Sequence, residues 1–236
     1  MKDITVYSVI ESQPIYGAIL RTIRRKGDPI LSRLNKLVFY SYYALFLMMS
    51  IDRYQIENLK IAIPSRANMK VNSINSDEAL HFAEELAPDF ILTNGTSILG
   101  NKWLSLGNPI INLHYGMIPK YRGRFCWFWP IVENDFKSVG ISYHLVTQRV
   151  DAGKTIIQAS LSGTSLGGLE IGEILVELTR LAVDNISNLL ELALHLDTRN
   201  DEQNNKLLYT AYLEPGITDY FLFVRNKKSY LRVGKS

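Results

Sequence analysis

The sequence predicts an α/β fold: a Rossmann-like, mostly parallel sheet with helices on both faces, plus a small C-terminal extension. Apolar, β-branched runs alternate with segments of helical periodicity, which is typical of parallel sheets covered by helices. Several of these runs end in polar loops that contain glycine. The composition, 47% hydrophobic and 21% charged residues, is ordinary for a globular protein. We divide the chain into a first domain over residues 1–165 and a second part, residues 166–236, made of a long helix and short β-like pieces.

The N-terminal elements are expected to be a strand over Asp3–Ile10 and two helices within Pro14–Ser50, separated near Gly27. The short apolar run "KIAIP" suits another strand. No clear second strand precedes Lys60, so the N-terminal part of the first domain is atypical.

The next elements are clearer. Asn75 and Glu78 have the spacing of a capping box, and a helix follows until Pro88. Strands are expected at "DFILT" and at Pro109–Leu113. Ligands of such sheets bind outside the carboxyl ends of the strands. The polar residues that follow or end these two strands are therefore expected along one edge of the sheet: Asn94, Thr96, Asn112 and His114.

In the second half, "SVGISYHLV" alternates as a half-buried strand would, and "TIIQASL" is its expected antiparallel partner. A long helix is expected over Ile171–Leu196, and the aromatic, basic tail contains strand-like pieces.

Charge and targeting signals exclude several classes. A net charge of +3 gives no argument for nucleic acid, and one cysteine excludes a disulfide framework. The N-terminus is too polar for a signal peptide. The apolar run Leu37–Met49 is far shorter than the roughly 20 residues that span a bilayer. A buried or subunit-facing helix is the simple interpretation, and a membrane-surface helix is the alternative. We expect a cytoplasmic protein that forms a homodimer.

Common catalytic motifs are absent from the sequence. It contains no P-loop, no G-x-G-x-x-G after the first strand and no G-x-S-x-G elbow. Cys126 lies between Phe125 and Trp127, a setting that raises the pKa of a thiol and favours a structural role.

Two histidines at strands and one carboxylate remain, together with an amide. Asn112 and His114 alternate and so share a face, and His144 precedes Asp151 closely. Two chemistries fit. Two histidines and a carboxylate can bind a catalytic metal. Alternatively, an amide and an imidazole can stabilise an oxyanion while a carboxylate handles the proton, as in metal-free acyl transfer.

The stretches "INLHYGMIPKYRG" and "VGISYHLVTQRVDAGKTI" together resemble the tetrahydrofolate-dependent formyltransferase family, and most of all its sugar N-formyltransferases. The shared features are an Asn-x-His strand end, a Pro-x-Tyr-Arg-Gly loop, a G-[IV]-[ST]-x-H strand and an Asp-x-Gly. The resemblance covers about residues 72–160. It makes residues 1–165 a formyltransferase catalytic domain.

The resemblance implies transfer of a formyl group from N10-formyltetrahydrofolate, a co-substrate, to an amine. Asn112 and His114 would hold the oxyanion, and Asp151 would assist proton movement. His144 would lie behind them or in the folate pocket, and Gly123 would shape the acceptor loop. No resident metal is implied. The residues that would bind the folate are Asn94, Gly95, Thr96, Ile98, Gln148 and Val150.

The acceptor is expected to be an amino sugar, because the sequence differs from family members that act on other acceptors. "ESQPIYG" after the first strand lacks the phosphate loop of the glycinamide ribonucleotide enzyme, and the tail is short for the barrel of methionyl-tRNA formyltransferase. A nucleotide-linked amino sugar for surface polysaccharide, such as lipopolysaccharide, fits best. Candidate acceptor contacts are Tyr121, Arg122, Trp127 and Trp129, with core packing the alternative for both tryptophans. A formyltetrahydrofolate hydrolase and a non-catalytic protein on the same scaffold remain alternatives.

Overall fold

The structure is a computed structural model of the chain, and it describes residues 5–11, 29–41, 68–161, 166–196 and 210–233. The expected strand "KIAIP" and most of the expected N-terminal helix pair lie outside these residues. Of that pair, residues 30–41 are helical as expected.

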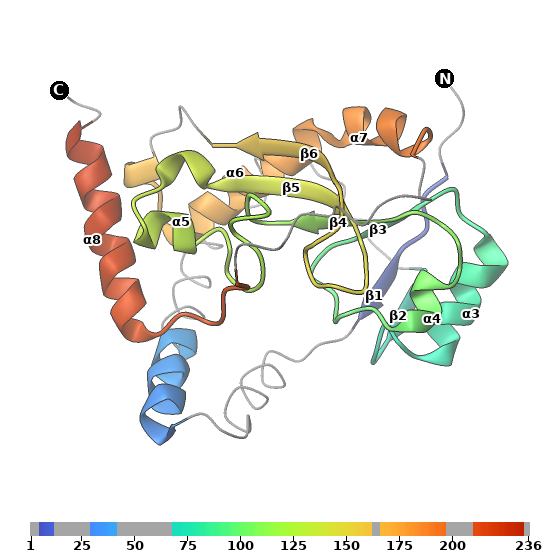
Figure 1. The fold of residues 1–236 in the computed structure, drawn as a ribbon, viewed down its shortest axis with the longest axis horizontal. Helices are drawn as coiled ribbons and strands as arrows, with labels where there is room; N and C mark the ends of the chain where they lie inside the picture. Colours follow the sequence, from blue (N-terminus) through green and yellow to red (C-terminus); the bar gives the residue numbers. More distant parts are fainter. Residues whose placement is uncertain (1–4, 12–28, 42–67, 162–165, 197–209, 234–236) are drawn as a thin grey trace.

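The described strands form two sheets (Figure 1). In the smaller one, β1 (Val9–Glu11) pairs in parallel with β2 (Met69–Val71), a strand that is too short to show an alternating pattern in the sequence. The larger sheet has the order β3-β4-β5-β6. Its strands are β3 (Ile91–Thr93), β4 (Ile110–His114), β5 (Gly140–Leu145) and β6 (Thr155–Ser160).

The α/β class is confirmed, and the pairing within the larger sheet is mixed. β3 and β4 are parallel, whereas β4–β5 and β5–β6 are antiparallel, so the expected antiparallel partnership of "TIIQASL" is confirmed. The expectation that β5 is half-buried is wrong, because all its residues are buried. Its alternation separates an apolar face from a polar face, and both are covered.

The described helices surround these sheets. After the helix of residues 30–41, the next ones along the chain are α3 (Asp77–Leu86), α4 (Asn101–Leu104) and α5 (Trp129–Val132). Further along the chain come α6 (Ile171–Asp184), α7 (Ile186–Ala193) and α8 (Ile217–Val233). Short 3₁₀ turns occupy Phe136–Ser138 and Leu166–Gly168. Figure 1 shows α6 and α7 along β5 and β6, and α3 and α4 beside β1 and β2.

The start of α3 differs from the expected capping box. Ser76, rather than Asn75, caps the helix, and its hydroxyl accepts the N–H of Ala79 at 3.3 Å. Asn75 instead bridges to the loop after β3, where its amide donates to the Ile98 carbonyl and accepts the Gly100 N–H. The residue that looked like a cap therefore fixes the loop at the end of β3.

The tail is helical, so the expectation of short β-like pieces is wrong for residues 217–233. Tertiary packing overrides the strand propensity of its aromatic residues. Phe223 is fully buried, stacks on Phe128 with ring centroids 4.5 Å apart, and joins the main core. The expected long helix of residues 171–196 is two helices, because it is interrupted at Asn185.

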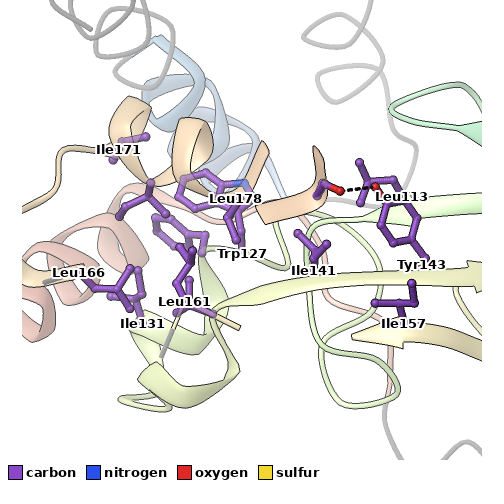
Figure 2. Close-up of a cluster of buried hydrophobic side chains, with 14 of the residues drawn as sticks. Leu113, Trp127, Ile131, Ile141, Tyr143, Ile157, Leu161, Leu166, Ile171 and Leu178 are labelled. Atoms are coloured by element: carbon purple, nitrogen blue, oxygen red, sulfur yellow. Dashed lines mark hydrogen bonds between the residues drawn. The ribbon is translucent and has the colours of Figure 1, made fainter. Parts of the chain in front are cut away.

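The main hydrophobic core lies between the apolar face of β4–β6 and helix α6 (Figure 2). Ile111 and Ile141 are fully buried there, opposite Leu178 of α6. The hydroxyl of Tyr143 donates to the Ala182 carbonyl at 3.0 Å, which satisfies the one polar group of that face. This face is the platform on which the polar face of the same strands is built.

Candidate active site

Strands β4 and β5 bring the predicted polar residues onto one face. In the antiparallel register Asn112 is opposite His144, and His114 is opposite Ser142. Residues directly opposite each other point to the same side of a sheet. The Nδ2 atom of Asn112 lies 3.2 Å from Nε2 of His144. The two imidazole rings stand edge to face, with centroids 6.2 Å apart.

The loop after β4 covers this polar face where a helix would cover an ordinary sheet. The hydroxyl of Ser142 donates to the Gly116 carbonyl at 2.6 Å and accepts the N–H of Ile118. The Gln158 amide donates to the Ile118 carbonyl, also at 2.6 Å. The loop then returns so that the Tyr121 carbonyl lies 2.9 Å from Nε2 of His114. Buried Ser142 and exposed Gln158 thus hold the loop that orients His114.

Asp151 reaches the site from the loop between β5 and β6. Its φ of 50° is left-handed, a conformation that Asp tolerates better than most residues. The following Gly153 is required by close approach, since a Cβ there would lie 1.8 Å from the Leu145 carbonyl oxygen. The Asp151 carboxylate accepts the Gly123 N–H at 2.8 Å. Its oxygens lie 3.6 Å from Nδ1 of His114 and 3.5 Å from Nε2 of His144.

Backbone carbonyls set the tautomers of both histidines. A carbonyl can only accept, so Nε2 of His114 carries a proton toward Tyr121. For the same reason Nδ1 of His144 carries a proton toward the Leu145 carbonyl, 2.9 Å away. In the neutral rings the two nitrogens that face Asp151 are therefore unprotonated. The three groups together form a proton-accepting set.

The Asn112 amide is oriented by its own partners. Its Oδ1 accepts the Thr93 hydroxyl at 3.1 Å, and one N–H donates to the bare Nε2 of His144. Among the described residues the second amide hydrogen has no acceptor, and Asn112 is only partly buried. The site thus combines one free, non-titrating donor with a group that takes up a proton.

Burial and charge shift the pKa values of His114 and Asp151. Burial lowers the pKa of His114 below its usual 6.5, although the nearby Asp151 opposes that shift. Burial by itself would raise the pKa of Asp151, but the neighbouring imidazoles of His144 and His114 and the Gly123 N–H together lower it. The Gly123 N–H donates to the Asp151 carboxylate whatever the state of the imidazoles, and it therefore favours the ionised carboxylate throughout. Near neutral pH the pair is an imidazole and a carboxylate.

Residues 50–163 match the model of a family described as formyl transferase, and this range includes Asn112, His114 and Asp151. This part of the chain is therefore similar to formyl transferases. The finding confirms the resemblance that was read from the sequence motifs.

The names of proteins similar to this part of the chain indicate different acceptors. A methionyl-tRNA formyltransferase of Thermotoga sp. is 35% identical over 92 residues, which are 38% of this chain and 29% of that protein. A GDP-perosamine N-formyltransferase of Brucella melitensis is 30% identical over 90 residues, which are 37% of this chain and 34% of that protein. The chain therefore spans about a third of the length of these relatives.

A solved structure shares the fold over more of the chain. A sugar N-formyltransferase from Shewanella sp. superposes with a TM-score of 0.51 and covers 92% of this chain and 86% of that protein. At 12% identity this likeness shows the fold alone.

The predicted folate-binding residues lie on two loops, and most of them are exposed. Asn94 and Gly95 are exposed, and Ile98 exposes 74% of its surface. In the second loop Gln148 is exposed and Val150 exposes 44%. The Ser97 N–H binds Glu11 Oε2 at 2.8 Å, so the first loop is anchored to β1. The apolar side chains fit a flat heterocycle, and the assignment stays a prediction.

The predicted acceptor residues behave differently from one another. Arg122 donates to the Val150 carbonyl at 3.4 Å, next to Asp151. Tyr121 is fully buried and its hydroxyl donates to Glu133 and Asp135, so its carbonyl rather than its ring reaches the site. Trp127 is 5% exposed within the core. Trp129 donates to the Arg124 and Leu213 carbonyls. The alternative of core packing thus holds for Trp127, and the ring of Tyr121 is not available to a substrate.

Sequence reasoning missed three supporting residues: Thr93, which orients Asn112, and Ser142 with Gln158, which hold the loop. A usable signal was present, because each is a polar residue on the same alternating face as the catalytic pair. The prediction for Cys126 is confirmed, since burial raises the pKa of its thiol.

The metal alternative finds no support in the geometry. Within the described ranges no three His, Cys, Asp or Glu side chains are grouped to hold a metal ion. No described helix is long and apolar enough to cross a membrane.

Proposed function

We propose that this protein transfers a formyl group from N10-formyltetrahydrofolate to the amine of an amino sugar. The observation that carries the proposal is the arrangement of Asn112, His114 and Asp151. It offers a free amide N–H beside an unprotonated imidazole nitrogen and a carboxylate. Acyl transfer to an amine needs a donor for the oxyanion and an acceptor for the amine proton.

The reaction would run as follows on these residues. The neutral amine attacks the formyl carbon, and the carbonyl oxygen gains charge that the free N–H of Asn112 stabilises. Asp151 accepts the proton of the attacking nitrogen, with Nδ1 of His114 beside it at 3.6 Å. That proton can pass from Asp151 to Nδ1 of His114, which then donates to the oxyanion. When the bond from carbon to N10 breaks, the same proton moves to N10 as tetrahydrofolate leaves.

Tetrahydrofolate would bind across the loops after β3 and after β5. The residues assigned to it are Asn94, Gly95, Thr96, Ile98, Gln148 and Val150. Ile98 and Val150 are large apolar residues that remain exposed, and Val150 directly precedes Asp151. Burial of their surface against the pterin ring would supply affinity, and backbone groups of the loops would supply its hydrogen-bond partners.

An amino sugar is proposed as acceptor on two grounds. One relative of the domain is a GDP-perosamine N-formyltransferase. The segment after the first strand, "ESQPIYG", lacks a glycine-rich phosphate loop. A nucleotide-linked sugar destined for surface polysaccharide is the specific proposal, and Arg122 and Trp129 are the residues left to contact it.

The test is incubation with N10-formyltetrahydrofolate and a panel of nucleotide-linked amino sugars, with methionyl-tRNA as the competing acceptor. We expect mass spectrometry to detect formylation of a sugar amine. An Asn112→Ala, His114→Ala double variant should lose this activity. Formate release without any acceptor would identify a hydrolase instead. No folate turnover and no folate binding by calorimetry would refute the proposal.

A further inference from the structure

The segment of residues 211–214, here called the clasp, lies against the catalytic loop after β4. The Tyr212 N–H donates to the Arg122 carbonyl at 2.8 Å, and the Arg124 N–H donates to the Tyr212 carbonyl at 3.0 Å. These two bonds form a parallel bridge between Tyr212 and Gly123. A segment far along the chain therefore pairs with the backbone that contacts Asp151.

Side chains hold the clasp in this place. The Tyr212 ring stacks on Tyr121 at 5.6 Å and on Trp129 at 5.2 Å between centroids. Its hydroxyl donates to Glu133. The indole N–H of Trp129 donates to the Leu213 carbonyl at 3.2 Å, and Arg124 forms an ion pair with buried Glu214.

Gly123 fits only because it has no side chain. Its φ is 101°, and a Cβ would lie 2.4 Å from the Tyr212 carbonyl oxygen and 2.9 Å from the Tyr212 nitrogen. These are backbone atoms that cannot turn away. The clasp is therefore packed directly onto Gly123, and the glycine of the "KYRG" loop is explained by that contact.

The peptide unit between Arg122 and Gly123 connects the clasp to the chemistry. In a planar trans peptide the C=O and the N–H point in opposite directions. The Arg122 carbonyl of this unit is held by the Tyr212 N–H, and the Gly123 N–H of the same unit binds Asp151 at 2.8 Å. Fixing one end of the peptide plane fixes the direction of the other.

We propose that Tyr212 is a positioning residue that sets the Asp151 carboxylate through the Arg122–Gly123 peptide. The inference rests on the proposed formyl transfer for its kinetic consequences. Its structural part, that the clasp orients the Gly123 N–H, stands independently of which reaction the site performs.

The test compares Tyr212→Ala with Leu213→Ala, a control in the same segment whose side chain is 50% exposed. We expect Tyr212→Ala to lower kcat about 10- to 100-fold with little change in the KM for the formyl donor, because the reacting groups are misplaced. Leu213→Ala should behave as the wild type. Tyr212→Phe keeps the ring and should restore most of the rate.

Two readouts separate positioning from a loss of folded protein. The acid limb of the kcat profile should move to higher pH in Tyr212→Ala, because the carboxylate loses a donor while His114, His144 and Cys126 still face it. Amide hydrogen exchange at Gly123, followed by NMR, should accelerate in Tyr212→Ala and not in Leu213→Ala. If Tyr212→Ala does not fold, Trp129→Phe removes the indole bond to the clasp and serves instead, with a smaller shift of the same two readouts.

The outcomes are distinguishable from failure of the proposed function. A wild type without formyl transfer refutes that function, and the exchange measurement still tests the clasp. Unchanged exchange at Gly123, or a lowered rate with the acid limb at its wild-type pH, overturns the positioning role.

Discussion

The two faces of strands β4 and β5 differ in what holds them. On one face Ile111, Leu113, Ile141 and Tyr143 pack against α6 in the main core. On the other face His114, Ser142 and His144 are buried and Asn112 is partly buried, but these residues are covered by loops and held by hydrogen bonds. The first face owes its stability to apolar area, and the second owes its geometry to satisfied polar groups.

One alternating strand can therefore contribute both to the stability of the core and to the geometry of the active site. Because successive side chains of a strand point to opposite sides, neighbouring residues of β4 or β5 lie alternately in the core and in the active site. Substitutions on the apolar face should therefore lower stability at constant kcat, and those on the polar face should lower kcat at nearly constant stability.

The largest effect on the polar face is expected for Asp151→Asn. The variant keeps the shape, can still accept the Gly123 N–H and tolerates the left-handed φ, but it cannot take a proton. We expect kcat for formyl transfer to fall about 100- to 10,000-fold, with the melting temperature nearly unchanged. A variant with wild-type kcat would remove Asp151 from the mechanism.

Asn112→Ala should come next. It deletes the free N–H assigned to the oxyanion, and loss of one such donor costs about 100- to 1,000-fold in kcat. Steady-state kinetics with saturating formyl donor measure the loss. Thr93→Val, which removes the hydroxyl that orients Asn112 without touching the amide, is the graded control and should lose less. Equal losses in both variants would contradict the assignment.

Ile141→Ala probes the apolar face of β5, one position before Ser142 of the polar face. Ile141 is fully buried in the core, so truncation should lower the free energy of unfolding by about 2–5 kcal/mol. The kcat of the protein that remains folded should stay near the wild type. Urea unfolding measures the free energy of unfolding. Kinetics normalised to the concentration of active sites, found by titration, measure kcat. Leu192→Ala in α7, 41% exposed, is the control with little expected change.

Much of this site could be predicted from the sequence because its information is local. Asn112 and His114 reveal a shared face by spacing alone, and the turn at Asp151 carries its own glycine. The partners of these residues could not be predicted. The Tyr121 carbonyl reaches His114, and the Tyr212 backbone reaches the loop, through contacts that no local pattern encodes.

The errors in the fold have the same origin. The aromatic tail has strand propensity, yet it is the helix α8, because Tyr220 and Phe223 can bury one side against α5 and the core. β2 has three residues and no alternation to detect, and it exists through pairing with distant β1. The structure of an element that depends on contacts with a distant segment cannot be predicted from its local sequence pattern.

The polar face should also respond to pH in a way the apolar face does not. The pKa of His114 is lowered below 6.5 and that of Asp151 below 3.8, so both are unprotonated above pH 6.5 and gain protons only as the pH falls. We expect kcat/KM to keep more than half of its plateau at pH 6.5, where an ordinary histidine would be half protonated. The acid limb of the kcat/KM profile is measured with two acceptors whose amines have different pKa values. A midpoint that follows the amine belongs to the substrate, and a midpoint common to both belongs to the enzyme. A midpoint above 6.5 common to both would contradict the lowered pKa of His114.

The smallest effect is expected where the polar face meets the folate loops. Val150 lies next to Asp151 and exposes 44% of its surface, so Val150→Ala removes apolar contact with the pterin and no catalytic group. One or two buried methyl groups are worth roughly 1 kcal/mol, so the KM for N10-formyltetrahydrofolate should rise a few-fold at unchanged kcat. Val183→Ala in α6, 42% exposed and outside the site, is the matched control. A fall in kcat without a rise in KM would place Val150 among the residues that orient Asp151 rather than those that bind folate.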